Sequence, residues 1–321
     1  MYKVAIIVPY FGQLPNYFQL WLFTAGKNTE IDFLVFSDSN FNKYNVPENV
    51  HIFKMTFDEV KQRVANILRY KFVLHKPYKI CDYRPLYGRI FSDYLVSYDF
   101  WAHCDPDIIW GNLKKFITED IMSNYDKIYN RGHLTFYRNI SNINNAVLTG
   151  GAKNNITSKD VYTSKYSAHF DEHEEVNDLI TAVGGKIYHQ VDAADIGYMK
   201  KEFVCMKHDK PCETVAAFCW QDGTLVGFAQ NGDKFDRVEY PYVHLQKRKM
   251  ELNLSDSLDN NFWIIPNAFV SADDMDQAQL TQYTKSDNIY EQQAHSNLRR
   301  RKLQNILDGA LLFRLKRMIH K

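Results

Sequence analysis

Two aspartates one residue apart end an aromatic, apolar segment of the chain, Tyr98-Asp-Phe-Trp-Ala-His-Cys-Asp-Pro-Asp107. Residues 98–104 predict a buried strand, and Pro106, which has no backbone N–H to donate, predicts that the strand stops there. Because alternate side chains of an extended chain share one face, Asp105 and Asp107 are expected to point the same way into a loop. Carboxylate oxygens are ligands that suit Mg²⁺ and Mn²⁺, so the pair predicts a divalent-cation site. A chance Asp-x-Asp on a solvated loop is the alternative.

A second charged group, Lys79-Ile-Cys-Asp-Tyr-Arg84, lies just before a predicted helix over residues 85–94. Lys79 and Arg84 could meet a diphosphate there, helped by the positive end of the helix dipole. A surface salt bridge with Asp82 is the alternative interpretation.

A third group follows a predicted strand over residues 237–243 and reads His244-Leu-Gln-Lys-Arg-Lys249. An imidazole followed by cations could complete a metal and phosphate site, and a solvated basic turn is the alternative. A fourth group, Phe170-Asp-Glu-His-Glu-Glu175, precedes a predicted helix, where acidic residues commonly serve only the helix dipole.

The elements that would position these groups alternate between strand and helix. Buried-strand patterns at 4–8, 32–36 and 51–55 are separated by helical patterns at 17–25 and, after the capping box Thr56–Glu59, up to about Leu68. This alternation predicts a parallel sheet with helices on both faces. Ligands of such sheets bind outside the carboxyl ends of the strands, where Pro9-Tyr10, Ser37-Asp38 and the aspartate pair all fall.

The composition limits the classes of function. The chain has 321 residues, 45% of them hydrophobic, and its net charge of +1 argues against a nucleic-acid partner. Five scattered cysteines without a Cys-x-x-Cys motif favour a reduced, cytoplasmic compartment. No apolar stretch approaches the roughly 20 residues that are needed to cross a bilayer. If the protein binds a membrane, we therefore expect a peripheral position on its inner face.

The last third of the chain changes character. Residues 216–221 and 224–229 around Asp222-Gly223 predict a hairpin. We expect a catalytic domain over 1–272, a polar linker over 273–295 and a basic amphipathic helix over 296–321. We expect that helix to bind an anionic membrane surface, with Leu303, Ile306, Leu307, Leu311 and Phe313 at the acyl boundary. Packing on the protein body or on a partner is the alternative.

Together these segments resemble a GT-A-fold bacterial glycosyltransferase of the polysaccharide-biosynthesis type, in which a Cys-Asp-x-Lys/Arg-Pro segment precedes an Asp-x-Asp motif. The motif residues are Cys81-Asp-Tyr-Arg-Pro85 and Asp105-Pro-Asp107, and the likeness extends to Tyr242-Val-His-Leu-Gln-Lys-Arg248. The resemblance implies an α/β, GT-A-like (Rossmann-like) mixed sheet flanked by helices, with a C-terminal amphipathic helical extension. It also implies transfer of a sugar, with UDP-hexose as the favoured donor, to a saccharide or lipid-linked saccharide acceptor in surface polysaccharide synthesis.

Carried over to this chain, the resemblance assigns roles to residues. Asp105, Asp107 and His244 would hold Mn²⁺ or Mg²⁺. Asp171 and Glu172 are both candidates for the catalytic acid on the acceptor side, and one sequence does not choose between them. The residues expected to contact the nucleotide-sugar donor are Pro9, Tyr10, Phe11, Asp38, Lys79, Asp82, Arg84, Lys247 and Arg248.

Two other functions fit parts of the pattern. A nucleotidyltransferase on a similar sheet would also use carboxylates and Mg²⁺, but the loop after the first strand, Pro9-Tyr-Phe-Gly-Gln-Leu-Pro15, lacks the glycine-rich basic character typical of that class. A non-catalytic carbohydrate-binding protein at the membrane would make the aspartate pair structural. Whether the transfer retains or inverts the anomeric configuration stays open.

Overall fold

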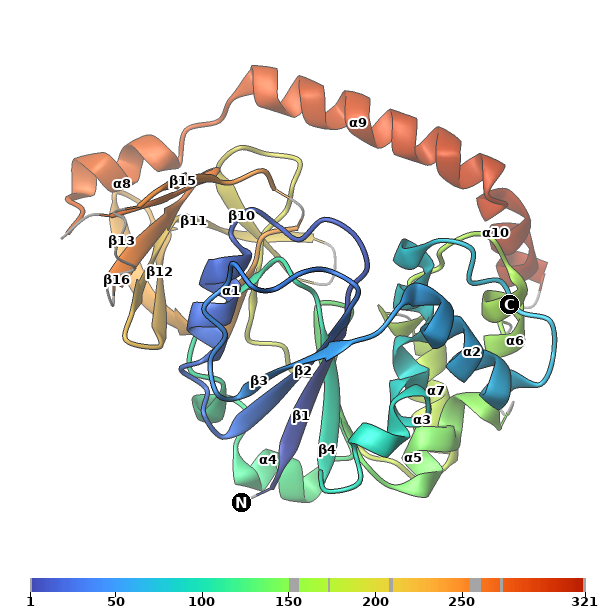
Figure 1. Ribbon diagram of the computed structural model, residues 1–321. Helices are drawn as coiled ribbons and strands as arrows, with labels where there is room; N and C mark the ends of the chain where they lie inside the picture. The colour runs from blue at the N-terminus through green and yellow to red at the C-terminus, as the bar shows by residue number, and fades with distance from the viewer. Residues whose placement is uncertain are drawn as a thin grey trace.

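A seven-stranded mixed sheet forms the centre of the protein. The computed structural model describes residues 2–149, 156–172, 174–207, 210–246, 248–254, 261–271 and 274–319. The strand order is β3 (Val50–Lys54), β2 (Ile31–Ser37), β1 (Val4–Pro9), β4 (Phe100–Cys104), β7 (Leu134–Arg138), β6 (Lys127–Arg131) and β8 (Ile187–Tyr188). The first four strands of this order are parallel, whereas β7 runs antiparallel to both β4 and β6. The parallel part therefore brings the carboxyl ends of β1, β2 and β4 to one edge (Figure 1).

Both faces of this sheet are buried, which explains the continuous apolar run of β1. Val4, Ile6 and Val8 pack on one face against α1 (Phe18–Ala25), while Ala5 and Ile7 pack on the other. The second face is covered by α2 (Phe57–Leu68), α3 (Tyr87–Ile90), α5 (Ser141–Asn145), α6 (Ser158–Thr163) and α7 (Glu174–Ala182). The predicted capping box is confirmed, because Thr56 accepts from the Glu59 backbone N–H and the Glu59 carboxylate accepts from that of Thr56.

Short helices connect the larger elements. They are the 3-10 helices η1 (Pro77–Leu86), η2 (Ser92–Tyr94), η3 (Leu113–Lys115), η4 (Ala146–Leu148) and η5 (Phe170–Glu172), and helix α4 (Glu119–Asn124). The single helix predicted over residues 85–94 is wrong: the chain forms the end of η1, the four-residue α3 and then η2. Pro85 lacks the N–H that a continuous α-helix would need, so a 3-10 helix runs through it.

A second sheet, antiparallel except for the parallel pair of β15 and β17, packs beside α1. Its order is β13 (Lys234–Tyr240), β12 (Thr224–Asn231), β11 (Lys210–Gln221), β16 (Asn261–Ile265), β17 (Ala268–Val270) and β15 (Glu251–Asn253), and β10 (Phe203–Lys207) also pairs with β11. The hairpin predicted at Asp222-Gly223 is confirmed, since β11 pairs with β12 there and both turn residues have positive φ. A third sheet of three short strands, β5 (Ile108–Trp110), β14 (Tyr242–His244) and β9 (Ala194–Asp195), joins the two halves.

The C-terminal segment is more helical than its composition predicts. Within the predicted linker 273–295, helix α8 (Gln277–Tyr283) begins after a capping box at Asp276, and α9 (Asn288–Leu307) begins after Asp287. The chain then turns at Gly309 into α10 (Ala310–Ile319). Figure 1 shows α9 passing from the second sheet across to the helices beside α6. In the part of the chain that the structure describes, no helix is long and apolar enough to cross a membrane.

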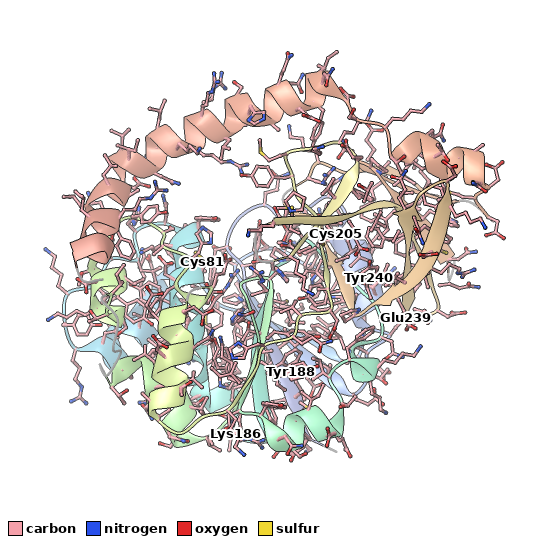
Figure 2. All side chains as sticks on the ribbon, turned by 180° about the vertical axis from the view of Figure 1, so that it is seen from behind. Cys81, Lys186, Tyr188, Cys205, Glu239 and Tyr240 are labelled. Carbon is pink, nitrogen blue, oxygen red and sulfur yellow. The ribbon has the colours of Figure 1, made fainter. Side chains whose placement is uncertain are left out.

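The fold is therefore the mixed α/β sheet with flanking helices and a C-terminal helical extension that the sequence predicts. All five cysteines are free. Figure 2 labels two buried ones, Cys81 in the helical layer and Cys205 on β10 of the second sheet.

Candidate metal site

The three-stranded sheet places an imidazole between two acidic segments. His244 ends β14 and lies opposite Ile108 of β5, so it is next to Asp107, the residue that precedes β5. On its other side His244 lies opposite Asp195 of β9. Asp105 comes from the loop directly after β4, where its backbone N–H donates to the carbonyl of His133 at 3.1 Å. Residues from four distant parts of the chain thus meet at the carboxyl end of β4.

Asp105, Asp107 and His244 form one candidate metal site. Nε2 of His244 lies 3.4 Å from Oδ1 of Asp107 and 3.7 Å from Oδ2 of Asp105. One ligand atom from each of the three side chains lies within 4.8 Å of the others, and Asp107 and His244 are buried. Two carboxylates and one imidazole suit Mn²⁺ and related divalent ions. The donor set therefore fits the cation that the sequence predicts.

The carboxylates around His244 stabilise a positive charge on its ring. Burial alone would lower the pKa of His244, but Asp107 and then Asp195 raise it to about 10. The imidazole is therefore protonated at neutral pH, and a cation bound at Nε2 would take the place of that proton.

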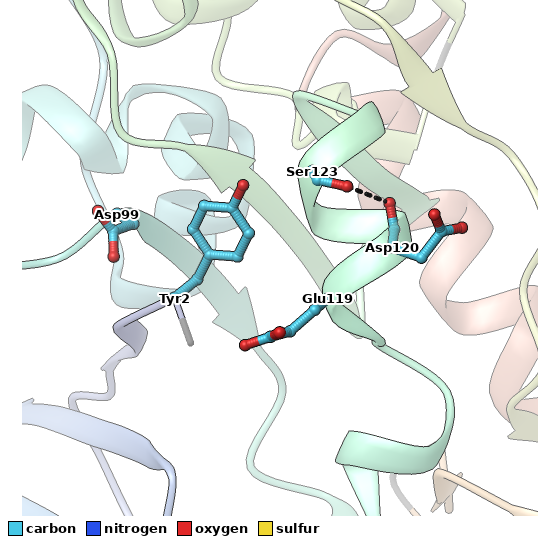
Figure 3. A pocket seen from close by; sticks show the side chains of 5 residues that line it. All are labelled: Tyr2, Asp99, Glu119, Asp120 and Ser123. Atoms are coloured by element: carbon cyan, nitrogen blue, oxygen red, sulfur yellow. Dashed lines mark hydrogen bonds between the residues drawn. The ribbon is translucent and has the colours of Figure 1, made fainter.

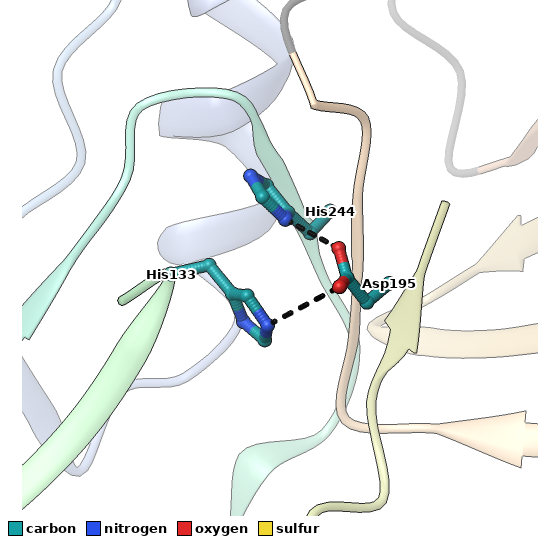
Figure 4. Close-up of side chains that lie close together, drawn as sticks. All are labelled: His133, Asp195 and His244. Carbon is teal, nitrogen blue, oxygen red and sulfur yellow. Dashed lines mark hydrogen bonds and ion pairs between the residues drawn. The ribbon is translucent and has the colours of Figure 1, made fainter. Parts of the chain in front are cut away.

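A second set of possible ligands shares the same imidazole. His133, Asp195 and His244 also have ligand atoms within 4.8 Å of one another (Figure 4). Nδ1 of His244 lies 2.8 Å from Oδ1 of Asp195, and Nε2 of His133 lies 3.9 Å from Oδ2 of Asp195. The sequence did not single out His133 or Asp195, because His133 occupies a hairpin turn and β9 is only two residues long.

Arg84 joins the metal site to a buried acid. One end of its guanidinium donates to Asp105 Oδ1, and Nη1 donates to Asp171 Oδ2 at 3.0 Å. Burial acts to lower the pKa of Arg84, but Asp105 and Asp171 hold it well above its ordinary value. The arginine thus carries its charge inside the protein because a carboxylate lies on each side of it.

Gly132, in the turn between β6 and β7, leaves the room that Arg84 and Glu172 need. A β-carbon at this position would lie 2.8 Å from Nη1 of Arg84 and 3.0 Å from Cδ of Glu172. We expect Gly132→Ala to lower the free energy of unfolding by about 1–3 kcal/mol, measured by denaturant titration, because the buried Arg84, which is held between two carboxylates, must move.

Gly197→Ala is the matched control, because its new methyl group would meet the flexible end of Met206, with Sδ at 3.1 Å, and the Val204 carbonyl at an ordinary contact distance of 3.4 Å. Equal stability of Gly132→Ala and the parent protein would contradict the close packing described for this turn.

The two acids predicted on the acceptor side have different surroundings. Asp171 is fully buried, and burial raises its pKa to about 6 although Arg84 acts to lower it. The Glu172 side chain is 40% exposed, and its carboxylate lies 3.6 Å from Nδ1 of His169. Burial acts to raise the pKa of Glu172, but His169 and Arg84 together lower it to about 2. Only Glu172 of this pair is open to a substrate.

The residues predicted to contact the donor separate into two groups. Pro9 and Tyr10 end β1 and are partly buried, and Asp38 is exposed just after β2. Burial raises the pKa of Tyr10, and the charges of Asp107 and Asp105 raise it further. Tyr10 therefore lies near the candidate metal site. Phe11 lies in the core beside Phe57, with 5.6 Å between the ring centroids.

Two of the predicted cations, Lys79 and Arg248, are held by the protein itself. Nζ of Lys79 is fully buried, 2.5 Å from Asp82 Oδ2 and 3.1 Å from the carbonyl of Val161. Asp82 also accepts from the backbone N–H groups of Ala168 and Phe170. Arg248 is buried and donates to several carbonyls of the 197–202 loop. Lys247 lies outside the described residues.

A separate shallow hollow opens at the opposite edge of the central sheet. Tyr2, Asp99, Glu119, Asp120 and Ser123 line it (Figure 3). Asp99 precedes β4, whereas the metal site follows β4, so the two lie at opposite ends of that strand. None of the residues predicted for metal or donor binding lines this hollow.

The fold is α/β, and a carboxylate–imidazole cluster that could hold a metal ion lies at the carboxyl edge of its parallel strands. The chain belongs to a family of unknown function, DUF6625, whose model matches residues 6–273. None of the curated proteins matches the chain. Among solved structures, it is similar to a crystal structure of the galactosyltransferase LgtC in complex with donor and acceptor sugar analogs. That match has 9% sequence identity and a TM-score of 0.31, and covers 60% of this chain and 75% of that chain.

Proposed function

We propose that this protein is a metal-dependent glycosyltransferase that moves a sugar, a hexose from a UDP-hexose in the favoured case, to a saccharide or lipid-linked saccharide acceptor in surface polysaccharide synthesis. The observation that supports it most is the cluster of Asp105, Asp107 and His244 at the carboxyl end of β4. A ligand of an open α/β sheet binds at this edge, and a nucleotide diphosphate there would share the cation with the three side chains.

Glycosyl transfer breaks an anomeric C–O bond, and a nucleotide diphosphate leaves. A bound Mn²⁺ or Mg²⁺ would neutralise negative charge on that leaving group. Tyr10 and Asp38, which directly follow β1 and β2, would contact the nucleotide. Arg84 holds Asp105 in place through their ion pair. If the reaction inverts, Glu172 is the exposed carboxylate that would accept the proton of the acceptor hydroxyl.

The test is to incubate the purified protein with Mn²⁺ and a panel of nucleotide sugars, and to follow nucleotide release. We expect slow hydrolysis of one donor, faster release once a suitable acceptor is added, and none in EDTA. A nucleotidyltransferase would instead release pyrophosphate from a nucleoside triphosphate and a sugar phosphate. A carbohydrate-binding protein would release neither product.

We also propose that the C-terminal helices bring this enzyme to an anionic membrane surface on the cytoplasmic side. Their apolar side chains include the exposed Leu303, Ile306, Leu307, Leu311, Leu312 and Leu315. The cations Arg299, Arg300, Arg301, Lys302 and Arg314 are also exposed. Basic helices with exposed leucines bind anionic lipid surfaces, and each cation near such a surface contributes about 1 kcal/mol.

The same segment also packs on the protein body, which is the alternative that the sequence left open. Phe313, predicted at the acyl boundary, is buried instead, 5.6 Å from the ring of Tyr166. Asp308 accepts from Lys76 at 2.9 Å, and Asp287 pairs with Lys201 at 3.2 Å. Ion pairs thus hold both ends of α9 against the protein body, while Leu303, Leu307 and the three arginines of this helix stay exposed.

We expect the triple variant Arg299→Glu, Arg300→Glu and Leu307→Glu to lose flotation with phosphatidylglycerol vesicles while keeping nucleotide-sugar hydrolysis. The parent should float at low salt and less at high salt, because salt screens exposed charges. The control is Lys54→Glu with Lys234→Glu, two exposed cations outside the C-terminal segment. Equal flotation of the parent and the triple variant would rule out this surface.

A further inference from the structure

We infer that Asp195 is the positioning residue that fixes the ring of His244, so that Nε2 is available to the cation between Asp105 and Asp107. This inference rests on the proposed metal site and adds a residue that neither the sequence motifs nor the family assigns to it.

The backbone register makes Asp195 the direct neighbour of His244. The two residues lie opposite each other in the parallel pairing of β9 with β14, and Nδ1 of His244 lies 2.8 Å from Oδ1 of Asp195. Gln246 donates to the same oxygen at 2.7 Å, which fixes the carboxylate. The Asp195 side chain is only 15% exposed, so water competes little for this hydrogen bond.

A carboxylate at Nδ1 determines which nitrogen of the imidazole can bind a cation. Asp195 accepts a hydrogen bond, so Nδ1 must carry a proton, and the lone pair of the neutral ring is then on Nε2. Nε2 faces the aspartate pair, at 3.4 Å from Asp107 and 3.7 Å from Asp105. Ligating histidines are commonly held in this way by a carboxylate on the other nitrogen.

The second set of possible ligands, His133, Asp195 and His244, competes for the same ring. A cation in that set would need the lone pair on Nδ1, with the proton on Nε2 donated to Asp107. The shorter contact at Nδ1, 2.8 Å against 3.4 Å at Nε2, favours the proton on Nδ1. We therefore assign the cation to the aspartate pair, and Asp195 to the support of its imidazole ligand.

His133 lies against the other side of this arrangement. Its ring centroid is 4.6 Å from that of His244, and its Nδ1 lies 2.8 Å from the hydroxyl of Tyr242. Its Nε2 is buried and, among the residues that the structure describes, has no hydrogen-bond partner. Contact with the His133 ring therefore limits how far the His244 ring can tilt. Nε2 of His133 would bind a cation only in the second ligand set.

The experiment measures Mn²⁺ affinity by electron paramagnetic resonance with no nucleotide sugar present. We expect Asp195→Asn to weaken Mn²⁺ binding by about 10- to 100-fold, because the amide can present a donor to Nδ1 and move the proton to Nε2. Asp195→Glu should recover part of the affinity. Asp192→Asn, which removes a carboxylate three positions away on the same segment, should bind as the parent does.

His133→Phe separates the two ligand sets, because it keeps a ring against His244 and removes Nε2. We expect its Mn²⁺ affinity to stay within a few-fold of the parent value, and its thermal unfolding to remain cooperative. In ¹⁵N spectra of the Mg²⁺-bound protein, His244 should show a protonated Nδ1 in the parent and lose that signature in Asp195→Asn.

Loss of Mn²⁺ binding in His133→Phe, or a protonated Nε2 of His244 in the Mg²⁺-bound parent, would assign the cation to the second set and overturn the inference. Equal affinity of Asp195→Asn and the parent would overturn it while leaving the proposed function standing. A parent protein that binds no Mn²⁺ would remove the proposed metal-dependent function and this inference together.

Discussion

Asp107→Asn should lower metal-dependent turnover of the nucleotide sugar by about 100- to 1,000-fold, because a cation contributes several kcal/mol to stabilising charge on a leaving diphosphate. The Asp107 side chain is only 10% exposed and lies 3.4 Å from Nε2 of His244. An asparagine keeps the shape of the residue and one of its oxygens, but removes the charge that the cation needs. Measuring kcat/KM against Mn²⁺ concentration checks this.

The matched control is Asp120→Asn on α4, which changes an exposed aspartate at the opposite edge of the sheet. It should leave kcat/KM unchanged. Full activity of the parent protein in EDTA would contradict the role given to Asp107, and so would an Asp107→Asn variant with the parent's Mn²⁺ dependence.

The parallel part of the sheet and the strand ends that carry the candidate site were predictable because both depend on local patterns. The run Val4–Val8 is apolar on both faces, which predicts a buried strand, and Pro9 predicts where that strand ends. Asp105 and His244 are far apart in the sequence, yet each follows a recognisable strand. The structure brings them to 3.7 Å because β5 pairs with β14.

The partners of buried cations were not predictable, because residue type does not show what surrounds a charge. The sequence left Lys79 with two possible partners, a phosphate or Asp82, and the structure pairs it with Asp82 inside the protein. Arg248 was expected to touch phosphate, yet it donates to backbone carbonyls of the 197–202 loop. Asp195 was missed for a different reason, since a strand of two residues has no periodicity to detect.

Arg84→Met should be the most destabilising substitution near the site, lowering the free energy of unfolding by about 3–5 kcal/mol. The guanidinium lies between Asp105 and Asp171, and its side chain is only 10% exposed. Without the guanidinium, the two carboxylates lose the cation that they share. Asp171 is fully buried, so it must take up a proton to stay buried without a partner. Urea titration of the two proteins at neutral pH measures the difference.

The double variant Arg84→Met with Asp171→Leu tests the cause of that loss. If the cost comes from the unpaired buried carboxylate, the double variant should be more stable than Arg84→Met alone, because the two effects are not additive for residues in contact. Lys114→Met, which removes an exposed pair with Glu30, should cost at most about 1 kcal/mol. A double variant that loses the sum of the two single costs would show that Arg84 stabilises this region by packing rather than by charge.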